Sequence, residues 1–397
     1  MLLDFIQMRA GRARRSVWGG VLGGCLLLSS LPAAASDWFA DDFETGTLVV
    51  EDSPAGRWDD AVPFSPNTLA SGTAGAHRGR YGFTVVDRDS VSGSQASINV
   101  VRASLTSEFH MRSWLRMRAV GTTGNVVLMQ GLPMLVELRL VLLPGLRWEL
   151  AARSGSGRTY VSLHGSDVAA DRWYLVEFGI RGLGTTSGEA RLWVDGIEQG
   201  TALSGQDFRG AANMVEQVMV GEPWSDTGTF TGSFDFDDVR VSAAPMASRL
   251  ELQRPVAASG SSGCLAVEVS LRSSENGTLA PSPYDAEVAL AVNGGAGDFH
   301  EDADCDSPVA RVVLPKGGSE RRVYFHPKDS GGTVTLTASH GDFLPASLSV
   351  DPANVLPGDG DEDGGGPWTC SSAPGAFGGL PLLLGAWLWR AHRRRAR

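Results

Sequence analysis

The sequence predicts an all-β protein made of two β-sandwiches. The chain of 397 residues contains 50 glycines and 20 prolines, which favour turns between short elements. Apolar residues alternate with polar ones in many short stretches, and no long stretch repeats with the period of a helix. A chain of this length is also long enough for two or three domains.

The first folded region spans about residues 37–243 and consists of successive predicted strands. In FHMRSWLRMRAV, the apolar Met111, Leu115 and Met117 lie on one face and polar residues on the other. Further strands are predicted in PMLVELRLVLL, RWELAAR, RWYLVEFGIRG, RLWVDGIEQG and GSFDFDDVRVS. The pair Asp195-Gly196 predicts a tight hairpin turn. Together these strands fit one large β-sandwich.

Several stretches of this region resemble the concanavalin A-like lectin/glucanase superfamily in its LamG-like jelly-roll form. They are DWFADDFETGTL, RWYLVEFGI, GEARLWVDG, VMVGEP and GSFDFDDVRVS, and the resemblance covers about half of the chain. It implies two antiparallel sheets, paired terminal strands, and ligands on the concave face or its rim loops. Such domains bind glycans or proteins, and some hydrolyse or cleave polysaccharides.

The second folded region, residues 249–352, carries at least five predicted strands, in CLAVEVSLRS, YDAEVALAV, VARVVLP, RRVYFHP and GTVTLTAS. Residues 318–324 and 332–338 resemble the ending of bacterial immunoglobulin-like surface modules. The resemblance implies a smaller immunoglobulin-like sandwich that acts as a rigid spacer.

Two of the four cysteines, Cys264 and Cys305, lie in this second region. In an oxidising compartment two such residues are expected to form a disulfide. The alternative, a pair of metal ligands, lacks a companion CxxC or histidine spacing.

Residues 1–35 have the organisation of a signal peptide: a basic start, an apolar core, and the small residues AAAS at the cleavage site. The sequence therefore predicts export. An alternative is a lipoprotein signal in which Cys25 of LGGC is lipidated.

Residues 353–369 form a predicted Gly/Asp-rich linker. Its stretch DGDEDG matches the first half of a calcium-binding loop, but Cys370 occupies the twelfth position, where the loop needs a glutamate. A flexible, hydrated spacer is the better interpretation.

Residues 370–397 contain Cys370, a short hydrophobic segment and an arginine cluster, in that order. The pattern resembles the myxobacterial C-terminal sorting tag of the MYXO-CTERM type. It implies processing near Cys370 by a dedicated sorting protease and retention at the cell surface. The hydrophobic segment is marginal as a transmembrane helix. A plain membrane anchor and a buried C-terminal helix remain alternatives.

The charge distribution argues against a nucleic-acid partner. The formal net charge is -11, although residues 1–35 contribute +3 and residues 370–397 contribute +5. The residues between them therefore carry about -19, which repels nucleic acid.

No catalytic motif stands out. The E-x-D-x-x-E strand of retaining glucanases is absent, as are G-x-S-x-G and H-E-x-x-H. A lyase built from a tyrosine, a histidine and an arginine on different strands would escape this search. We therefore expect a surface-anchored, non-catalytic protein that binds a glycan or matrix component. A polysaccharide hydrolase or lyase and a purely structural envelope protein are the alternatives.

Two sets of residues are candidate sites. Pairing of the terminal strands would gather acidic side chains suited to Ca²⁺, although acids also protect a sheet edge from aggregation; they are Asp41, Asp42, Asp235, Asp237 and Asp238. If their strands are neighbours, a second set forms an arginine-lined face with an exposed indole, suited to an acidic polysaccharide. Its principal members are Arg112, Trp114, Arg116 and Arg139, accompanied by Arg118, Glu137, Arg147, Glu149 and Arg153. The alternative is an ordinary solvated sheet face.

Overall fold

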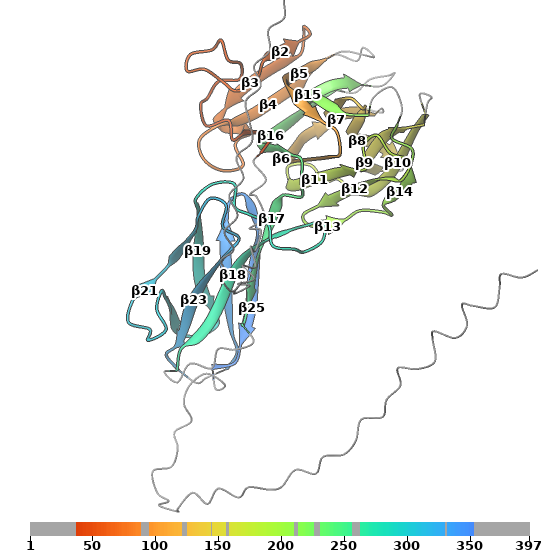
Figure 1. The fold of residues 1–397 in the computed structure, drawn as a ribbon. Coiled ribbons are helices and arrows are strands. Elements are labelled where there is room, and N and C mark those ends of the chain that lie inside the picture. Colours follow the sequence, from red (N-terminus) through yellow and green to blue (C-terminus); the bar gives the residue numbers. More distant parts are fainter. Residues whose placement is uncertain are drawn as a thin grey trace, which may run out of the picture. The chain divides into compact units, whose positions relative to one another are not determined.

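The computed structural model describes residues 37–88, 95–120, 125–143, 145–155, 159–209, 213–225, 231–255, 263–329 and 332–352, all within one compact unit, Met1–Leu356. The predicted signal peptide with Cys25, the 353–369 linker and the tag with Cys370 lie outside the described residues. Every described element is a strand except one 3-10 helix, η1 (Thr73–Gly75), so the all-β prediction is confirmed (Figure 1). None of the helical structure in this part of the chain is long and apolar enough to cross a bilayer.

The first sandwich contains a nine-stranded sheet in the order β13-β12-β11-β6-β16-β4-β3, with β1 also paired to β16 and β14 to β12. Its strands are β1 (Phe39–Asp41), β3 (Thr68–Gly72), β4 (Gly82–Asp87), β6 (Glu108–Val120), β11 (Trp173–Arg181), β12 (Gly188–Val194), β13 (Ile197–Glu198), β14 (Leu203–Gln206) and β16 (Gly232–Ser242).

The facing sheet has seven strands in the order β10-β9-β8-β7-β15-β5-β2. They are β2 (Asp60–Pro63), β5 (Ala96–Leu105), β7 (Val126–Pro133), β8 (Val136–Leu143), β9 (Gly145–Ser154), β10 (Thr159–Asp167) and β15 (Val215–Ser225). Strands β7 to β10 follow one another as antiparallel neighbours, so residues close in sequence come together on this sheet.

Alternate residues of both sheets form one hydrophobic core. Met111, Leu115 and Met117 of β6 are buried in it as predicted, because successive side chains of a strand point to opposite faces. From the seven-stranded sheet, Trp148, Leu150 and Ala152 of β9 enter the same core. The side chains between these residues point away from the core, and they form the outer faces of the two sheets.

Two predicted features of the first sandwich are present. The terminal strands of the sandwich pair, since β1 is antiparallel to β16 with Phe39 opposite Val241. The hairpin between β12 and β13 turns at Asp195 and Gly196, both of which have positive φ (50° and 72°). Two positive φ angles are the signature of the tight turn predicted from this Asp-Gly pair.

The second sandwich has its own hydrophobic core, formed by residues between Ala247 and Val350. Its nine strands follow the order β21-β20-β23-β18-β17-β25-β24-β19-β22. They are β17 (Ala247–Gln253), β18 (Leu265–Ser273), β19 (Ala286–Asn293), β20 (Gly297–His300), β21 (Pro308–Val309), β22 (Arg311–Leu314), β23 (Glu320–Pro327), β24 (Val334–His340) and β25 (Phe343–Val350). Its assignment as immunoglobulin-like stays a prediction.

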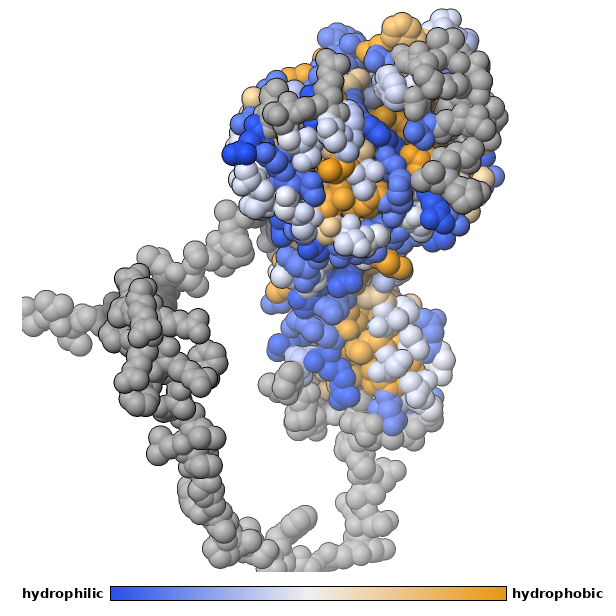
Figure 2. Space-filling model, turned by 90° about the vertical axis from the view of Figure 1, so that its right-hand side faces the viewer, coloured by the Kyte–Doolittle hydropathy of each residue, from blue (hydrophilic) through white to orange (hydrophobic). Residues whose placement is uncertain are grey.

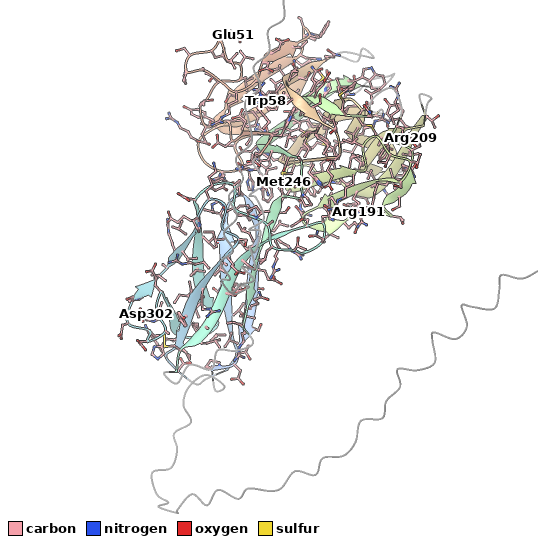
Figure 3. The ribbon with its side chains drawn as sticks, viewed as in Figure 1. Glu51, Trp58, Arg191, Arg209, Met246 and Asp302 are labelled. Carbon is pink, nitrogen blue, oxygen red and sulfur yellow. A yellow bond between two sulfur atoms is a disulfide. The ribbon has the colours of Figure 1, made fainter. Side chains whose placement is uncertain are left out.

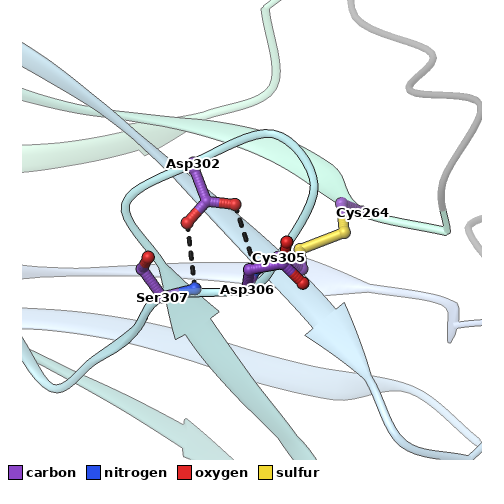
Figure 4. Close-up of a disulfide and its surroundings, with 5 residues drawn as sticks. All are labelled: Cys264, Asp302, Cys305, Asp306 and Ser307. Atoms are coloured by element: carbon purple, nitrogen blue, oxygen red, sulfur yellow. Dashed lines mark hydrogen bonds between the residues drawn. A yellow bond between two sulfur atoms is a disulfide. The ribbon is translucent and has the colours of Figure 1, made fainter.

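A disulfide joins Cys264, which precedes β18, to Cys305 in the loop after β20, as the sequence predicts. The carboxylate of Asp302 accepts hydrogen bonds from the backbone N–H groups of Asp306 and Ser307, at 3.0 and 2.9 Å (Figure 4). These bonds fold the loop back on itself, so that Cys305 is held beside the start of β18.

Candidate functional site

The predicted arginine-lined face does not form as one surface. Strand β6, which carries Arg112, Trp114 and Arg116, pairs with β11 and β16 in the nine-stranded sheet. Strand β8, which carries Arg139, pairs with β7 and β9 in the other sheet. The prediction that these strands are neighbours is therefore wrong, and the set divides between the two sheets. Residues 112, 114, 116 and 118 lie on β6, whereas Glu137, Arg139, Arg147, Glu149 and Arg153 share a face of the other sheet.

Arg112 is buried where the two sandwiches meet. It is 1% exposed, its Nη1 atom donates to the carbonyl of Ala247, and its guanidinium carbon lies 5.5 Å from the ring centroid of Phe343. Burial lowers the pKa of the Arg112 guanidinium, and the charge of Arg240 lowers it further. A side chain in this position joins the two sandwiches and is not a binding surface for a polysaccharide.

Trp114 and Arg116 also contact other side chains of the protein. The ring of Trp114 stacks on His77 at a centroid distance of 3.9 Å. Arg116 donates from Nε to Asp235 at 2.8 Å and lies 4.7 Å from the ring centroid of Trp173. Neither side chain presents the open indole or free guanidinium that the sequence predicted.

The five acids proposed as calcium ligands bond to separate protein groups. Asp41 accepts from Trp58 Nε1 at 2.7 Å, and Asp42 accepts from a backbone N–H at 3.3 Å. Asp235 pairs with Arg116 and Arg118, Asp237 accepts three backbone N–H groups, and Asp238 pairs with Arg78. Burial raises the pKa of Asp41 to about 6 and that of Asp237 to about 7, which opposes the ionised form that Ca²⁺ requires.

Within the described ranges, no three His, Cys, Asp or Glu side chains come together as a metal site. The structure therefore does not bring the five carboxylates to a single ion.

The outer face of the seven-stranded sheet carries a connected set of polar side chains, which we call the polar face. Strand alternation sends Val136, Leu138 and Leu140 of β8 into the core and leaves its polar residues outside. Strands β8, β9 and β10 lie side by side (Figure 1), and Arg139 is opposite Glu149, which is opposite His164. The polar face consists of Gln130, Glu137, Arg139, Glu149, Tyr160 and His164.

Arg139 is at the centre of the polar face. Its Nε atom donates to Glu137 Oε2 at 2.7 Å, and its Nη1 atom donates to Glu149 Oε1 at 3.3 Å. Its guanidinium carbon lies 4.7 Å from the ring centroid of Tyr160, a cation–π contact. One arginine thus links three neighbouring strands.

The remaining members extend this network to both sides. Gln130 Nε2 donates to Glu137 Oε1 at 2.7 Å, and the Tyr160 hydroxyl donates to the same oxygen at 3.4 Å. His164 Nδ1 lies 3.2 Å from Glu149 Oε2. The carboxylate of Glu137 therefore receives hydrogen bonds from three strands, and its position is fixed.

Exposure differs sharply across the polar face. Glu137 is 5% exposed, whereas Tyr160 is 39% exposed and His164 is also open to solvent. Burial and the neighbouring charge of Glu137 raise the pKa of Tyr160, so its phenol stays protonated at neutral pH. A ligand would contact the tyrosine ring and the imidazole first. The hydrogen-bonded charged groups of Glu137, Arg139 and Glu149 lie beneath them.

Tyr160, His164 and Gln130 were missed by the sequence reasoning. The stretch TYVSLHGSD alternates Tyr160, Ser162 and His164 with the apolar Val161 and Leu163, which is the pattern of a strand with one polar face. This alternation is the signal that could have placed the tyrosine and the histidine beside Glu149.

Comparisons with known proteins give only remote structural likenesses. No protein-family model matches the sequence, and a search of curated proteins finds no match. Among solved structures, an endo-β-1,4-glucuronan lyase from the fungus Trichoderma reesei is similar with 14% identity and a TM-score of 0.40, over 53% of this chain and 96% of that one. The alginate lyase Aly36B is similar with 9% identity and a TM-score of 0.35, over 52% and 95%.

Domain 4 of an extracellular arabinanase from Geobacillus stearothermophilus, in complex with arabinotriose, is similar with 16% identity and a TM-score of 0.29, over 53% and 93%. Scores this low carry no argument about what this chain binds or does.

Proposed function

We propose that the protein binds an extracellular glycan through the polar face of its seven-stranded sheet and does not alter it chemically. The observation that carries this proposal is the network around Arg139, in which side chains from β7 to β10 are held by one another. Groups fixed before binding lose little conformational entropy when a ligand arrives, which favours affinity.

The chemistry of the polar face suits a sugar. Carboxylate oxygens of Glu137 and Glu149 accept hydrogen bonds from hydroxyl groups, and the guanidinium of Arg139 donates them in one plane. The half-exposed ring of Tyr160 offers an apolar surface for the C–H face of a pyranose. Figure 2 shows one side of the molecule, on which hydrophobic and hydrophilic residues are intermixed.

An acidic glycan fits better than a neutral one. Arg153 is directly opposite Tyr160 on the neighbouring strand, and its Nε atom is buried without a hydrogen-bond partner among the described residues. A buried N–H without a partner is costly. A uronate carboxylate placed beside Tyr160 would bring a negative charge close to this guanidinium.

Display outside the cell is part of the same proposal. The disulfide between Cys264 and Cys305 is of the kind that persists in oxidising compartments. The signal peptide and the tag at residues 370–397 would export the chain and hold it at the membrane, with processing by a sorting protease at Cys370. This arrangement would present the sandwiches to polysaccharides outside the cell.

A polysaccharide lyase is the second candidate, because Tyr160 and His164 project from one strand beside Arg139. Elimination in a uronate chain needs a base for the C5 proton, an acid for the departing oxygen, and a positive group near the carboxylate. The raised pKa of Tyr160 keeps its phenol in the acid form. His164 would be the base and an arginine the positive group.

One experiment separates these functions. The purified protein is applied to an array of neutral and carboxylated polysaccharides, with and without a chelator, and each mixture is followed at the ultraviolet absorbance of an unsaturated uronate. Binding without product supports the first proposal, and accumulating product supports the lyase. An absence of both would favour a purely structural envelope protein and contradict the other two.

A further inference from the structure

A small cavity lies where the two sandwiches join. In the first sandwich it is lined by the sheet that contains β6 and β16, whereas the polar face belongs to the other sheet. Its volume is about 20 Å³, which is room for one atom of the size of a water oxygen or a chloride ion. The connecting segment, residues 243–246 between β16 and β17, contributes Met246, which is labelled in Figure 3. The other lining residues are Asp37, Arg112, Arg240, Ser242, Pro245, Ala247, Pro281 and Pro283.

Two buried guanidinium groups line this cavity. Arg112 of β6 and Arg240 of β16 are opposite each other in the sheet, and they are 1% and 7% exposed. The Nε atom of each is buried and has no hydrogen-bond partner among the described residues. Buried donors nearly always have a partner, so two such atoms beside one cavity indicate an acceptor inside it.

The two arginines differ in their ion pairs. Arg240 is paired with Asp37 through Nη1 at 2.9 Å. In the described part of the chain Arg112 forms no ion pair, and its Nη1 atom donates only to the neutral carbonyl of Ala247. Its neighbour across the sheet, Glu177, bonds to Ser248, and burial raises the pKa of that carboxyl. The charges of Glu177, Asp342 and Asp238 raise the pKa of Arg112, but none of these carboxylates is in contact with its guanidinium as an ion pair. A buried guanidinium without a contacting counterion is unfavourable.

We propose that this cavity binds one chloride ion, held by the Nε atoms of Arg112 and Arg240. A monatomic anion fits this volume. Pro245, Pro281 and Pro283 supply walls without N–H groups, and the two arginines supply the positive charge in the lining, where Asp37 is the one carboxylate. The ion neutralises Arg112 and stabilises the contact of β6 and β16 with the connecting segment.

The proposal predicts that chloride stabilises the full-length protein specifically. Its melting temperature is measured in sodium chloride and in sodium gluconate at equal ionic strength, so that general screening cancels. We expect chloride to raise Tm by about 2 °C or more, because a ligand that binds only the native state stabilises it. Arg112→Gln should abolish the difference, and the control Arg311→Gln, at an exposed ion pair of β22, should retain it.

A second measurement does not depend on the variant folding. Crystals of the wild-type protein grown in bromide should give an anomalous peak between Arg112 and Arg240. Equal melting temperatures in the two salts would overturn the proposal, since water would then fill the cavity. A chloride effect without a bromide peak at this position would also overturn it, because the ion would be bound elsewhere.

Discussion

The guanidinium of Arg139 lies 4.7 Å from the ring centroid of Tyr160, and both side chains project from the outer face of the seven-stranded sheet. The same guanidinium donates to Glu137 and Glu149, so the ring stands over a charged group that cannot easily rotate away. An aromatic ring held in one position above paired charges is suited to contact with a sugar ring. Substitution of each of these residues therefore tests the proposed glycan binding.

Replacing Arg139 by glutamine should weaken glycan binding about tenfold or more, because a charge-assisted hydrogen bond is lost and Glu137 and Glu149 lose their shared partner. Titration calorimetry with the strongest-binding polysaccharide of the array measures the effect. Arg147→Gln is the matched control, since Arg147 lies on the same face but pairs with the exposed Asp167. Equal losses in both variants would refute a specific role for Arg139.

Substitutions at Tyr160 distinguish binding from cleavage. Tyr160→Phe keeps the ring over Arg139 and removes only the hydroxyl, so a binding protein should keep its affinity within about twofold. Tyr160→Ala should lower the affinity about tenfold, because the ring contact is lost. A phenylalanine variant that still binds but no longer forms an unsaturated product would instead identify Tyr160 as the acid of a lyase.

The disulfide should stabilise the protein substantially. Cys264 and Cys305 are 41 residues apart, and closing a loop of that length in the unfolded chain is worth about 3 to 4 kcal/mol in the entropic model. Denaturant unfolding of a Cys264→Ser, Cys305→Ser variant measures the loss. A reducing agent should lower the stability of the wild type and leave the variant unchanged; equal stability of both proteins under oxidising conditions would contradict the prediction.

The contact between the sandwiches should weaken at alkaline pH through Asp342. This residue lies in the turn between β24 and β25, where it hydrogen bonds with Asp238 and contacts Arg78 and Tyr284. Burial, together with the bond to Asp238 and its charge, raises the pKa of Asp342 from 3.8 to about 8. Because the folded-state value is the higher one, this stabilisation is complete below about pH 4 and is lost as the pH rises through about 8.

Asp342→Asn imitates the protonated carboxyl group and has no such titration. Between about pH 6 and about pH 9, the melting temperature of the wild type should therefore fall relative to that of the variant. Melting curves that run parallel across this interval would show that Asp342 does not carry the extra proton in the folded protein.

The faces of single strands could be predicted from the sequence, because alternation is a local property. Met111, Leu115 and Met117 were correctly placed in the core, and the Asp195-Gly196 hairpin has the predicted turn. The grouping of Glu137, Arg139 and Glu149 was also correct, since β8 and β9 are consecutive antiparallel strands.

The position of β6 could not be predicted, because its partners are distant in sequence. Strand β6 lies between β11 and β16, and nothing in FHMRSWLRMRAV identifies those neighbours. Arg112 looked exposed from alternation alone, but Ala247 and Phe343 cover it in the folded chain. A polar residue on the outer face of a strand can thus be buried by a second sandwich that the local pattern does not reveal.

Hydroxyl-radical footprinting of the native protein with its strongest-binding glycan tests the central claim most directly. If the polar face is the binding site, the glycan should lower the oxidation of Tyr160 and His164. The exposed Phe64, on the loop after β2, should stay as reactive as in the free protein. Unchanged oxidation of Tyr160 and His164 at saturating glycan would contradict the claim that this face is the binding site.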